Sequence, residues 1–313
     1  MLEKFQNFIN LFQKKVIKSS GLLSIYIGVG FVTFAYSKKS TEQPVISIME
    51  RVSLEGSRLQ EVLSAFMSQH GLSNVRCMIT LNPMDYRLIY LDAPNVDDEE
   101  LGAAAKWLVK EFINFPLSNA AVDAFRVPVR AGQPSKMYAV VAQLDRIKSI
   151  VDACAKASME VISIDIAELS LRNLMQLLQE DKGEVGFLFM RPDFHAVLIS
   201  SNDTLCFSRT VETKAQYQSD NAEQNVQTID YLVREIERSL HFYQSNIGNN
   251  ELSKIWISTE LENQDALVTA LSENMEIGCE ALDFNRFFKI ENGVDLSSAV
   301  QGAIALGGLL RQE

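Results

Sequence analysis

The sequence predicts an α/β protein of two or three lobes, in which the two halves of the chain repeat one layout. Three observations support this class. Each half of the chain opens with strands joined by short turns and continues into helix–strand units. A strand–helix–strand segment, Asp97–Val127, interrupts the first half. Finally, 313 residues are too many for one small core and suit two or three lobes.

The composition is that of an ordinary globular protein and argues against several functions. Hydrophobic residues make up 47% of the chain and charged residues 22%. The formal net charge of −11 argues against broad nucleic-acid binding. The four cysteines and three histidines show no metal-ligand or disulfide spacing, so we expect neither a metal site nor a disulfide framework.

Residues 1–20 are expected to form an amphipathic helix. Its apolar face consists of Phe5, Phe8, Ile9, Phe12 and Val16, and its lysines are Lys4, Lys14, Lys15 and Lys18. A basic amphipathic helix is suited to an anionic membrane surface or to a partner protein, which predicts such a contact through residues 1–18. A helix packed on the body of the protein, or a loose arm, is the open alternative.

The uncharged segment Gly21–Ser37 is expected to form a strand, a glycine turn and a second strand. Gly28 and Gly30 interrupt it, and β-branched residues are frequent on either side. A membrane-spanning helix is the alternative, but the segment is shorter than the roughly 20 apolar residues that a span requires.

The remaining elements follow from hydrophobic periodicity and turn signals. In the first half we expect strands at Pro44–Glu50, Arg76–Leu81, Tyr86–Leu91, Val122–Pro128, Met137–Leu144 and Val161–Ile166, and helices at Ser57–Gly71, Asp145–Ala157 and Ile166–Gln179. In the second half we expect strands at Gly186–Met190, Ala196–Ser200, Thr204–Val211 and Lys254–Ser258, and helices at Ala222–Ser245 and Asn263–Asn274. The C-terminal segment Leu296–Arg311 carries small residues that permit close packing.

The segment after Asp97 contains a further helix, with apolar positions at helical spacing. These positions are Leu101, Ala104, Leu108 and Phe112. The pattern stops at Phe115-Pro116, because proline cannot continue a helix. The module contains neither cysteine nor histidine, which suggests a surface for a partner.

The repeated layout resembles the actin and sugar-kinase superfamily, a ribonuclease H-like fold. In that superfamily two lobes face each other across a cleft, and two hairpin turns hold phosphates. The resemblance implies a first lobe of residues 21–82 and 158–182, an inserted subdomain of residues 83–157 and a second lobe of residues 183–313.

Three segments resemble the PilM family, the actin-like proteins of type IV pilus assembly. They are the acidic helix module with Asp98-Glu99-Glu100, Trp107, Phe112, Phe115-Pro116-Leu117 and Asp123; the strand and helix Ile162–Leu174; and Thr204–Val211 together with Glu235–Ser245. The similarity spans nearly the whole chain after residue 20. Within the family it is nearest to the divergent MshI-like branch, which serves MSHA pilus biogenesis.

The nucleotide-binding positions of the family are altered in this chain. The first hairpin should contain an Asp and small hydroxyl residues, but it reads Tyr26-Ile27-Gly28-Val29-Gly30-Phe31. The second turn, Phe189–Phe194, has Arg191, Pro192 and Asp193 and no glycine, and proline has no N–H to offer a phosphate. We therefore expect no bound ATP or magnesium at the degenerate positions Tyr26, Gly28, Gly30, Arg191 and Asp193.

The resemblance implies a non-catalytic scaffold, cytoplasmic and peripheral to the bacterial inner membrane. Its implied partner is the cytoplasmic tail of a PilN-like single-span protein, and a PilB-like motor ATPase is a further possibility. We expect Trp107, Phe112, Phe115 and Leu91 to line the tail site, near strands Arg76–Leu81 and Tyr86–Leu91; the alternative is that these side chains are core. An ATP-binding switch in the same machine is the alternative function.

Deleting residues 1–18 is expected to reduce membrane association without unfolding the body, because the basic amphipathic segment is then missing. Fractionation of cells expressing each form, together with melting curves of the purified proteins, measures both effects. Equal fractionation of the two forms would remove this segment from the proposed membrane or partner contact.

Overall fold

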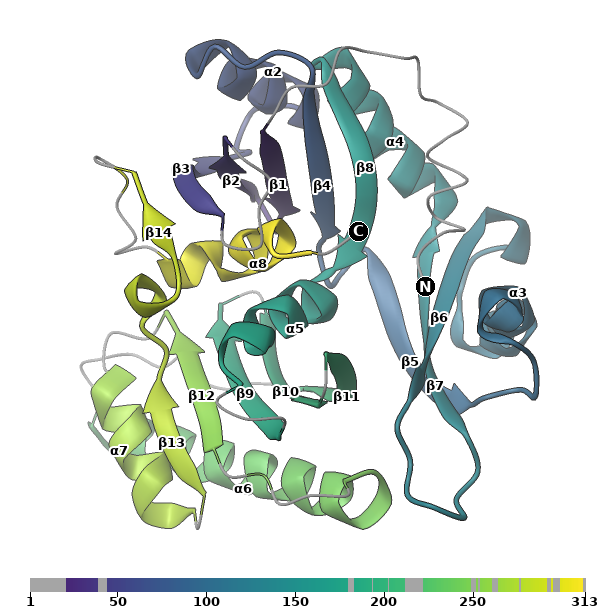
Figure 1. The fold of residues 1–313 in the computed structure, drawn as a ribbon, viewed down its shortest axis with the longest axis vertical. Helices are drawn as coiled ribbons and strands as arrows, with labels where there is room; N and C mark the ends of the chain where they lie inside the picture. Colours follow the sequence, from purple (N-terminus) through teal and green to yellow (C-terminus); the bar gives the residue numbers. More distant parts are fainter. Residues whose placement is uncertain are drawn as a thin grey trace.

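The computed structural model describes residues 21–38, 44–179, 183–192, 194–201, 203–211, 222–248, 252, 254–260, 264–275, 277–291, 294 and 299–311. Over these residues the chain forms three β-sheets with helices between and around them (Figure 1). Two sheets share one strand order, and the third is smaller and lies to one side. The predicted α/β class with two lobes and an inserted unit is confirmed.

The first lobe is built on a six-stranded sheet in the order β14-β3-β2-β1-β4-β8. Its strands are β1 (Leu22–Ile27), β2 (Phe31–Ser37), β3 (Val45–Ser53), β4 (Val75–Leu81), β8 (Met159–Ile166) and β14 (Lys289–Ile290). The first three form an antiparallel meander, and β4 and β8 run parallel to β1. All residues of β1 and β2 are buried, because helices cover both faces of this sheet.

The β1–β2 hairpin confirms the predicted structure of the uncharged segment, which is not a membrane-spanning helix. Its β-branched residues pair across an antiparallel ladder, and Gly28 and Gly30 form the turn. Among the described helices, none combines the length and the apolar character needed to cross a membrane.

The second lobe repeats this topology in a five-stranded sheet, in the order β11-β10-β9-β12-β13. Its strands are β9 (Glu184–Arg191), β10 (Phe194–Ser201), β11 (Thr204–Thr210), β12 (Lys254–Thr259) and β13 (Gly278–Ala281). Strands β9, β10 and β11 form the meander, and β12 and β13 extend the sheet in parallel. Both sheets therefore place their first five strands in the order third, second, first, fourth, fifth.

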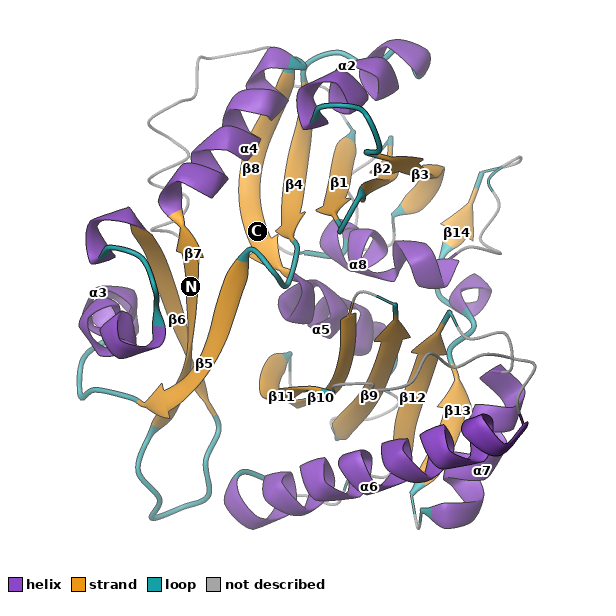
Figure 2. Ribbon diagram, turned by 180° about the vertical axis from the view of Figure 1, so that it is seen from behind, coloured by secondary structure: helices purple, strands orange, loops and turns teal. Residues whose placement is uncertain are grey.

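Two helices form a layer between the sheets (Figures 1 and 2). α5 (Ala167–Leu177) follows β8 and packs on β10 and β11, whereas α8 (Ala299–Leu309) packs on α5 and on β1, β2 and β4. α2 (Leu59–Gln69) and α4 (Leu144–Lys156) pack on each other at the first sheet, and α6 (Ala222–Asn246) and α7 (Gln264–Asn274) flank the far side of the second. The C-terminal helix thus returns to the first lobe.

The predicted lobe boundaries stay a prediction, and three elements contact a lobe other than the one predicted for them. The predicted insertion, residues 83–157, includes α4, yet α4 packs against α2 and β8 of the first lobe. The predicted second lobe, residues 183–313, includes α8 and β14, yet both pack or pair with strands of the first sheet.

The inserted unit is a three-stranded antiparallel sheet in the order β5-β7-β6, covered on one face by a helix. Its elements are β5 (Tyr86–Asp92), α3 (Asp98–Leu108), β6 (Ala120–Val127) and β7 (Lys136–Gln143), with 3₁₀ turns at Val109–Phe112 and Leu117–Asn119. A separate small core joins helix and sheet and consists of Leu101, Ala105, Val109, Ala120, Ala124, Met137, Ala139 and Val141.

The buried face of α3 uses only part of the apolar pattern seen in the sequence. The helix packs through Leu101, Ala105 and, at its C-terminal end, Val109, whereas Leu108 and Phe112 are exposed, the latter being predicted to line the partner site. A side chain at Gly102 would lie 3.3 Å from a carboxylate oxygen of Asp123, so the helix approaches β6 on its smallest residues. The small side of α3 faces the sheet because it allows the closer approach, and the larger apolar residues are left outside.

Two strands and one turn of the second half were not predicted from the sequence. β13 and β14 are four and two residues long, and a 3₁₀ turn lies at Phe284–Arg286. Strands this short carry too few alternating positions to be recognised by periodicity.

Small residues of α8 allow the close packing that the C-terminal sequence predicts. A side-chain carbon at Gly307 would lie 2.0 Å from the main-chain oxygen of Ser170, and one at Gly308 would lie 2.1 Å from Ser24 Oγ. The carbonyl of Gly307 also accepts a hydrogen bond of 3.0 Å from Asn173 Nδ2. The helix therefore lies against both α5 and the first sheet without room for a methyl group.

Replacing Gly307 by alanine is expected to lower the free energy of unfolding by about 1–3 kcal/mol, because the methyl group meets main-chain atoms that must move. Urea titration followed by circular dichroism measures this change. Gly183→Ala is the matched control, since among the described residues, its chain neighbours aside, no atom lies within 4 Å of its added carbon. The control is expected to change stability by less than about 0.5 kcal/mol, and an equal effect of the two substitutions would contradict the packing argument.

Candidate functional site

The first hairpin turn, between β1 and β2, is covered by an aromatic ring. Gly28 N donates a hydrogen bond of 2.9 Å to Phe31 O, and Gly30 has a positive φ of 76°. A side-chain carbon at Gly28 would lie only 2.0 Å from the Phe31 ring. The space left by this glycine is therefore filled by Phe31 rather than left open toward the second lobe.

The second hairpin turn, between β9 and β10, sends a buried cation toward the first lobe. The Arg191 side chain is 0% exposed. Its Nε lies 3.1 Å from Glu260 Oε1, and its Nη1 donates a hydrogen bond of 3.0 Å to Gln301 O on α8. Its Cζ lies 4.9 Å from the ring centre of Phe31 and 5.3 Å from that of Tyr26.

Glu260 and Arg51 complete this arrangement. Glu260 follows β12, and its N–H donates a hydrogen bond of 3.1 Å to Met190 O. Arg51, on β3, has Nη1 at 3.7 Å from Glu260 Oε1 and Cζ at 3.8 Å from the Phe31 ring centre. We call Tyr26, Phe31, Arg51, Arg191 and Glu260 the interlobe cluster.

The residues at the two turns do not fit a magnesium nucleotide. Phosphate cradles need exposed backbone N–H groups, but Phe31 covers Gly28, and Pro192 has no N–H. Tyr26, on β1 beside the first turn, is fully buried and has no carboxylate to hold a metal. Asp193, a predicted degenerate position, lies outside the described residues. Within the ranges that the structure describes, no group of three acidic, histidine or cysteine side chains is placed to hold a metal ion.

The predicted partner-binding residues separate into two groups. Trp107 is 73% exposed and Phe112 is 42% exposed, and the neighbouring Leu108 is also exposed, so the core alternative is wrong for these aromatic residues. Phe115 and Leu91 are half-buried against the small core of the insertion. We call Trp107, Leu108 and Phe112 the α3 patch. The predicted membrane-facing residues Phe5, Phe8, Phe12, Lys14 and Lys15 lie outside the described residues.

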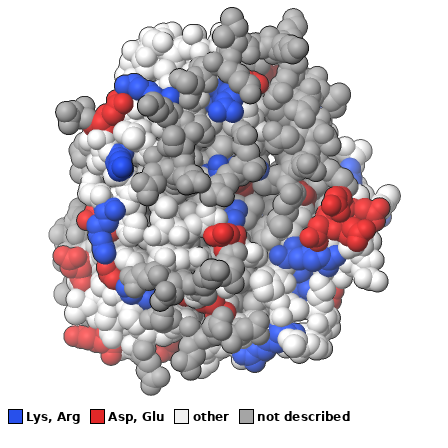
Figure 3. All heavy atoms as spheres, in the orientation of Figure 1, with Lys and Arg blue, Asp and Glu red and all other residues white. Residues whose placement is uncertain are grey.

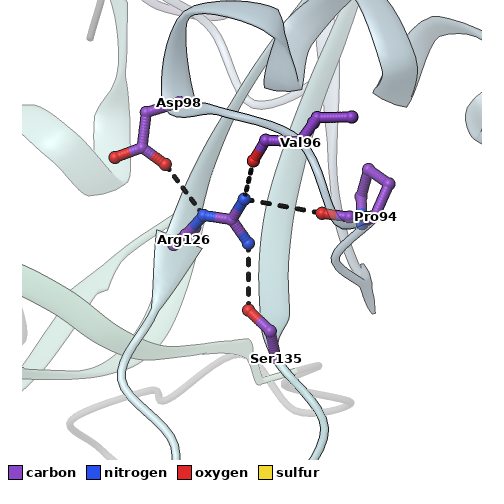
Figure 4. Close-up of polar contacts among 5 residues, drawn as sticks. All are labelled: Pro94, Val96, Asp98, Arg126 and Ser135. Carbon is purple, nitrogen blue, oxygen red and sulfur yellow. Dashed lines mark hydrogen bonds and ion pairs between the residues drawn. The ribbon is translucent and has the colours of Figure 1, made fainter.

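The loop that leads into α3 is held by one arginine (Figure 4). Arg126, on β6, donates from Nε to Asp98 Oδ1 at 2.8 Å and from Nη1 to Ser135 Oγ at 3.0 Å. Its Nη2 donates to the carbonyls of Pro94, at 3.4 Å, and Val96. These bonds fix the start of the helix against the sheet and so set the position of the α3 patch.

The other face of the inserted sheet is occupied by the second lobe. The Tyr138 hydroxyl accepts a hydrogen bond of 2.9 Å from Ser208 N on β11, and Tyr90 and Phe125 lie beside its ring. Arg130, in the β6–β7 connection, donates to the carbonyls of Gly248, at 2.8 Å, and Gln244 at the end of α6. The α3 side of the insertion is therefore directed away from both lobes (Figure 1).

A buried polar junction connects β5 of the insertion to α5. The Tyr86 hydroxyl donates to Glu168 and accepts a hydrogen bond of 3.2 Å from Ala167 N. Burial raises the pKa of Glu168 to about 7, although the bond from Tyr86 acts in the opposite direction. Nearby, Arg311 Nη1 donates a bond of 3.0 Å to Asp165 Oδ2. This junction fixes the insertion at the first residue of β5.

Sequence reasoning found part of this site. It identified Tyr26, Gly28, Gly30 and Arg191 as altered positions. It did not connect Arg51 or Glu260 with them, because the contacts join residues that are far apart in the chain. No pattern within either segment signals such a contact.

The two lobes of repeated topology give this chain the actin-like ATPase fold, and many solved structures are similar to it. No known protein-family profile matches the sequence, and no curated protein matches it significantly. The chain therefore resembles known proteins in its fold, and its sequence identifies no family.

Three solved structures are similar to this chain over more than nine-tenths of its length. A chain of the PilM–PilN type IV pilus biogenesis complex is similar with a TM-score of 0.69, at 16% identity over 92% of this chain and 97% of that one. The cytoplasmic domain of EpsL, an inner-membrane component of the type II secretion system of Vibrio cholerae, is similar with a TM-score of 0.51, at 11% identity over 94% of this chain and 97% of that one. An actin-like ATPase-fold protein of Bacteroides thetaiotaomicron reaches 0.52, at 10% identity over 92% of this chain and 98% of that one.

Replacing Glu168 by glutamine is expected to flatten the pH dependence of stability. The folded-state pKa of about 7 lies above the ordinary value of 4.5, so the protonated carboxyl favours the folded state. Its contribution is complete below pH 4.5 and is lost as the pH rises through about 7, which amounts to roughly 3 kcal/mol. Glutamine carries no charge and keeps an oxygen for Tyr86.

Urea titrations between pH 4.5 and 8 test this expectation. The Glu168→Gln variant should show a smaller decline in stability over this range than the unmodified protein. Asp123, whose pKa burial raises to about 6, contributes to the decline that remains. Glu111→Gln, an exposed position on the insertion, is the control and should keep the decline. Parallel curves for Glu168→Gln and the unmodified protein would mean that Glu168 is ionised in the folded state.

Proposed function

We propose that this chain is a non-catalytic, actin-like component of a type IV pilus or related secretion machine, at the cytoplasmic face of the inner membrane. The observation that carries the proposal is the likeness, over 92% of the chain, to a protein of the PilM–PilN complex. The likeness to the cytoplasmic domain of EpsL supports the same kind of machine. Nearer assignment to the MshI-like branch of MSHA biogenesis rests on sequence resemblance.

The proposed partner is the cytoplasmic tail of a PilN-like single-span protein. The α3 patch offers apolar anchors for such a tail, since Trp and Phe are the residues that most often dominate interface energetics. Strand β5 is an edge of its sheet over the described residues and offers backbone groups to an extended peptide. Leu91 lies on this strand, and Phe115 packs on the core that supports it.

The acidic residues near the α3 patch favour a partner with positive charge. Exposed acidic residues at positions 97–100 open α3, and acidic atoms gather where α3 lies in the common orientation of Figures 1 and 3. A tail that carries basic residues beside its apolar ones would complement both features. Contacts with a PilB-like motor ATPase, and with the membrane through residues 1–18, belong to the same proposal.

The scaffold is preferred to the alternative of an ATP-binding switch because of the interlobe cluster. A switch needs two turns that receive phosphate, and here one turn is covered by Phe31 and the other supplies the buried Arg191. No step of the proposed function is catalytic.

The substitution Trp107→Ala is expected to weaken binding of a PilN-like tail peptide by tenfold or more, which corresponds to about 1.4 kcal/mol. Because Trp107 is an exposed residue on the outer side of α3, the melting curve should stay cooperative and nearly unchanged. Isothermal titration calorimetry with a peptide of the cytoplasmic tail of the PilN-like single-span protein measures the affinity. Phe112→Ala should also weaken binding.

Phe242→Ala is the matched control, because Phe242 is a similarly exposed aromatic residue on α6 of the second lobe. It should leave the affinity unchanged. Unaltered binding by both Trp107→Ala and Phe112→Ala would remove the α3 patch from the proposal and leave β5 as the site. Absence of any binding by the unmodified protein would contradict the proposed partner.

A further inference from the structure

Arg191 belongs to the second lobe, but its guanidinium also contacts residues of the first. It ends β9, and its guanidinium lies near the rings of Tyr26 on β1 and Phe31 on β2. Its hydrogen bond to Gln301 O reaches α8, which packs on the first sheet. A cation with no exposed surface is tolerated only where other groups replace water, and here groups of both lobes do so.

Glu260 makes the connection reciprocal. It is anchored to the second lobe by its N–H bond to Met190 O, and its carboxylate lies between the guanidinium groups of Arg191 and Arg51. Arg51 belongs to β3 of the first lobe and also stacks on Phe31. Each lobe therefore contributes a cation, and one carboxylate and one ring contact both cations.

We propose that the interlobe cluster is a permanent latch, formed by side chains of this chain at the place where the fold would otherwise hold a nucleotide. The latch joins the two hairpin turns directly, so the angle between the lobes is fixed without a ligand. In this role Arg191 is a positioning residue, and Phe31 is the surface on which both arginines rest.

A latch of this kind has a definite consequence. A cleft that closes on a ligand changes shape when the ligand binds, whereas a cleft joined by its own side chains does not. This inference goes beyond the proposed function, because it holds whichever partner occupies the α3 patch and fails independently of that partner.

Arg191→Met tests the latch. Methionine keeps an apolar stem against the two rings and removes the charge and the hydrogen bonds. We expect a larger radius of gyration by small-angle scattering, faster deuterium exchange at residues 28–31 and 189–191, and a melting temperature lower by several degrees. Addition of 5 mM Mg-ATP should leave the melting temperature and the scattering of the unmodified protein unchanged.

Arg286→Met is the matched control. Arg286 also pairs with a carboxylate, Glu280 at 2.8 Å, and lies near the rings of Trp256 and Phe287. All of these residues lie between positions 256 and 287, so none of these contacts involves the two hairpin turns. The control should leave the radius of gyration and the exchange at residues 28–31 unchanged. It removes the same kinds of contact without separating the two hairpin turns.

Several outcomes would overturn the latch. One is an unchanged radius of gyration together with unchanged exchange at both turns in Arg191→Met. Another is stabilisation or compaction of the unmodified protein by Mg-ATP, which would show that the cleft still receives nucleotide. If Arg191→Met fails to fold, Glu260→Gln and Arg51→Met take its place. Each should then raise exchange at residues 28–31, and unchanged exchange in both variants would equally overturn the proposal.

Discussion

The close contact between α8 and the layers on either side of it is the constraint on which the rest of the structure depends. Gly307 and Gly308 bring this helix within contact of α5 and of the first sheet. One part of α8 then presents the carbonyl of Gln301 to the interlobe cluster. Just beyond its other end, Arg311 reaches the polar junction below the insertion. α8 and the residue just after it thereby contribute to the interlobe cluster and to the region that anchors the insertion.

The interlobe cluster is built around the buried ion pair of Arg191 and Glu260. A buried ion pair often contributes little net stability, since removing two charges from water costs about as much as their attraction returns. Its larger effect is on specificity, because an alternative arrangement of the lobes would leave Arg191 without its partners. The insertion is held by a different principle, in which Tyr138 and Arg130 bond to main-chain atoms of the second lobe. The three sheets are thus tied by contacts that do not depend on a bound ligand.

Local signals predicted the elements, and long-range contacts decided the details that sequence could not supply. Glycines and β-branched residues marked the first hairpin, because turn geometry and strand packing are local. The apolar pattern of α3 left its buried face undecided, because the choice between Ala105 and Leu108 depends on how closely β6 approaches. The altered turns were visible from missing glycines and the proline. The pairing of Arg51 with Glu260 was not, since it joins different lobes.

The two tryptophans of the chain lie in opposite surroundings. Trp107 stands in solvent on the insertion, whereas Trp256 is 2% exposed inside the second lobe. A soluble quencher such as iodide reaches the first indole and not the second. The intrinsic fluorescence of this protein therefore divides into two optical reporters, one that follows occupancy of the insertion and one that follows integrity of the second sheet, without any attached dye.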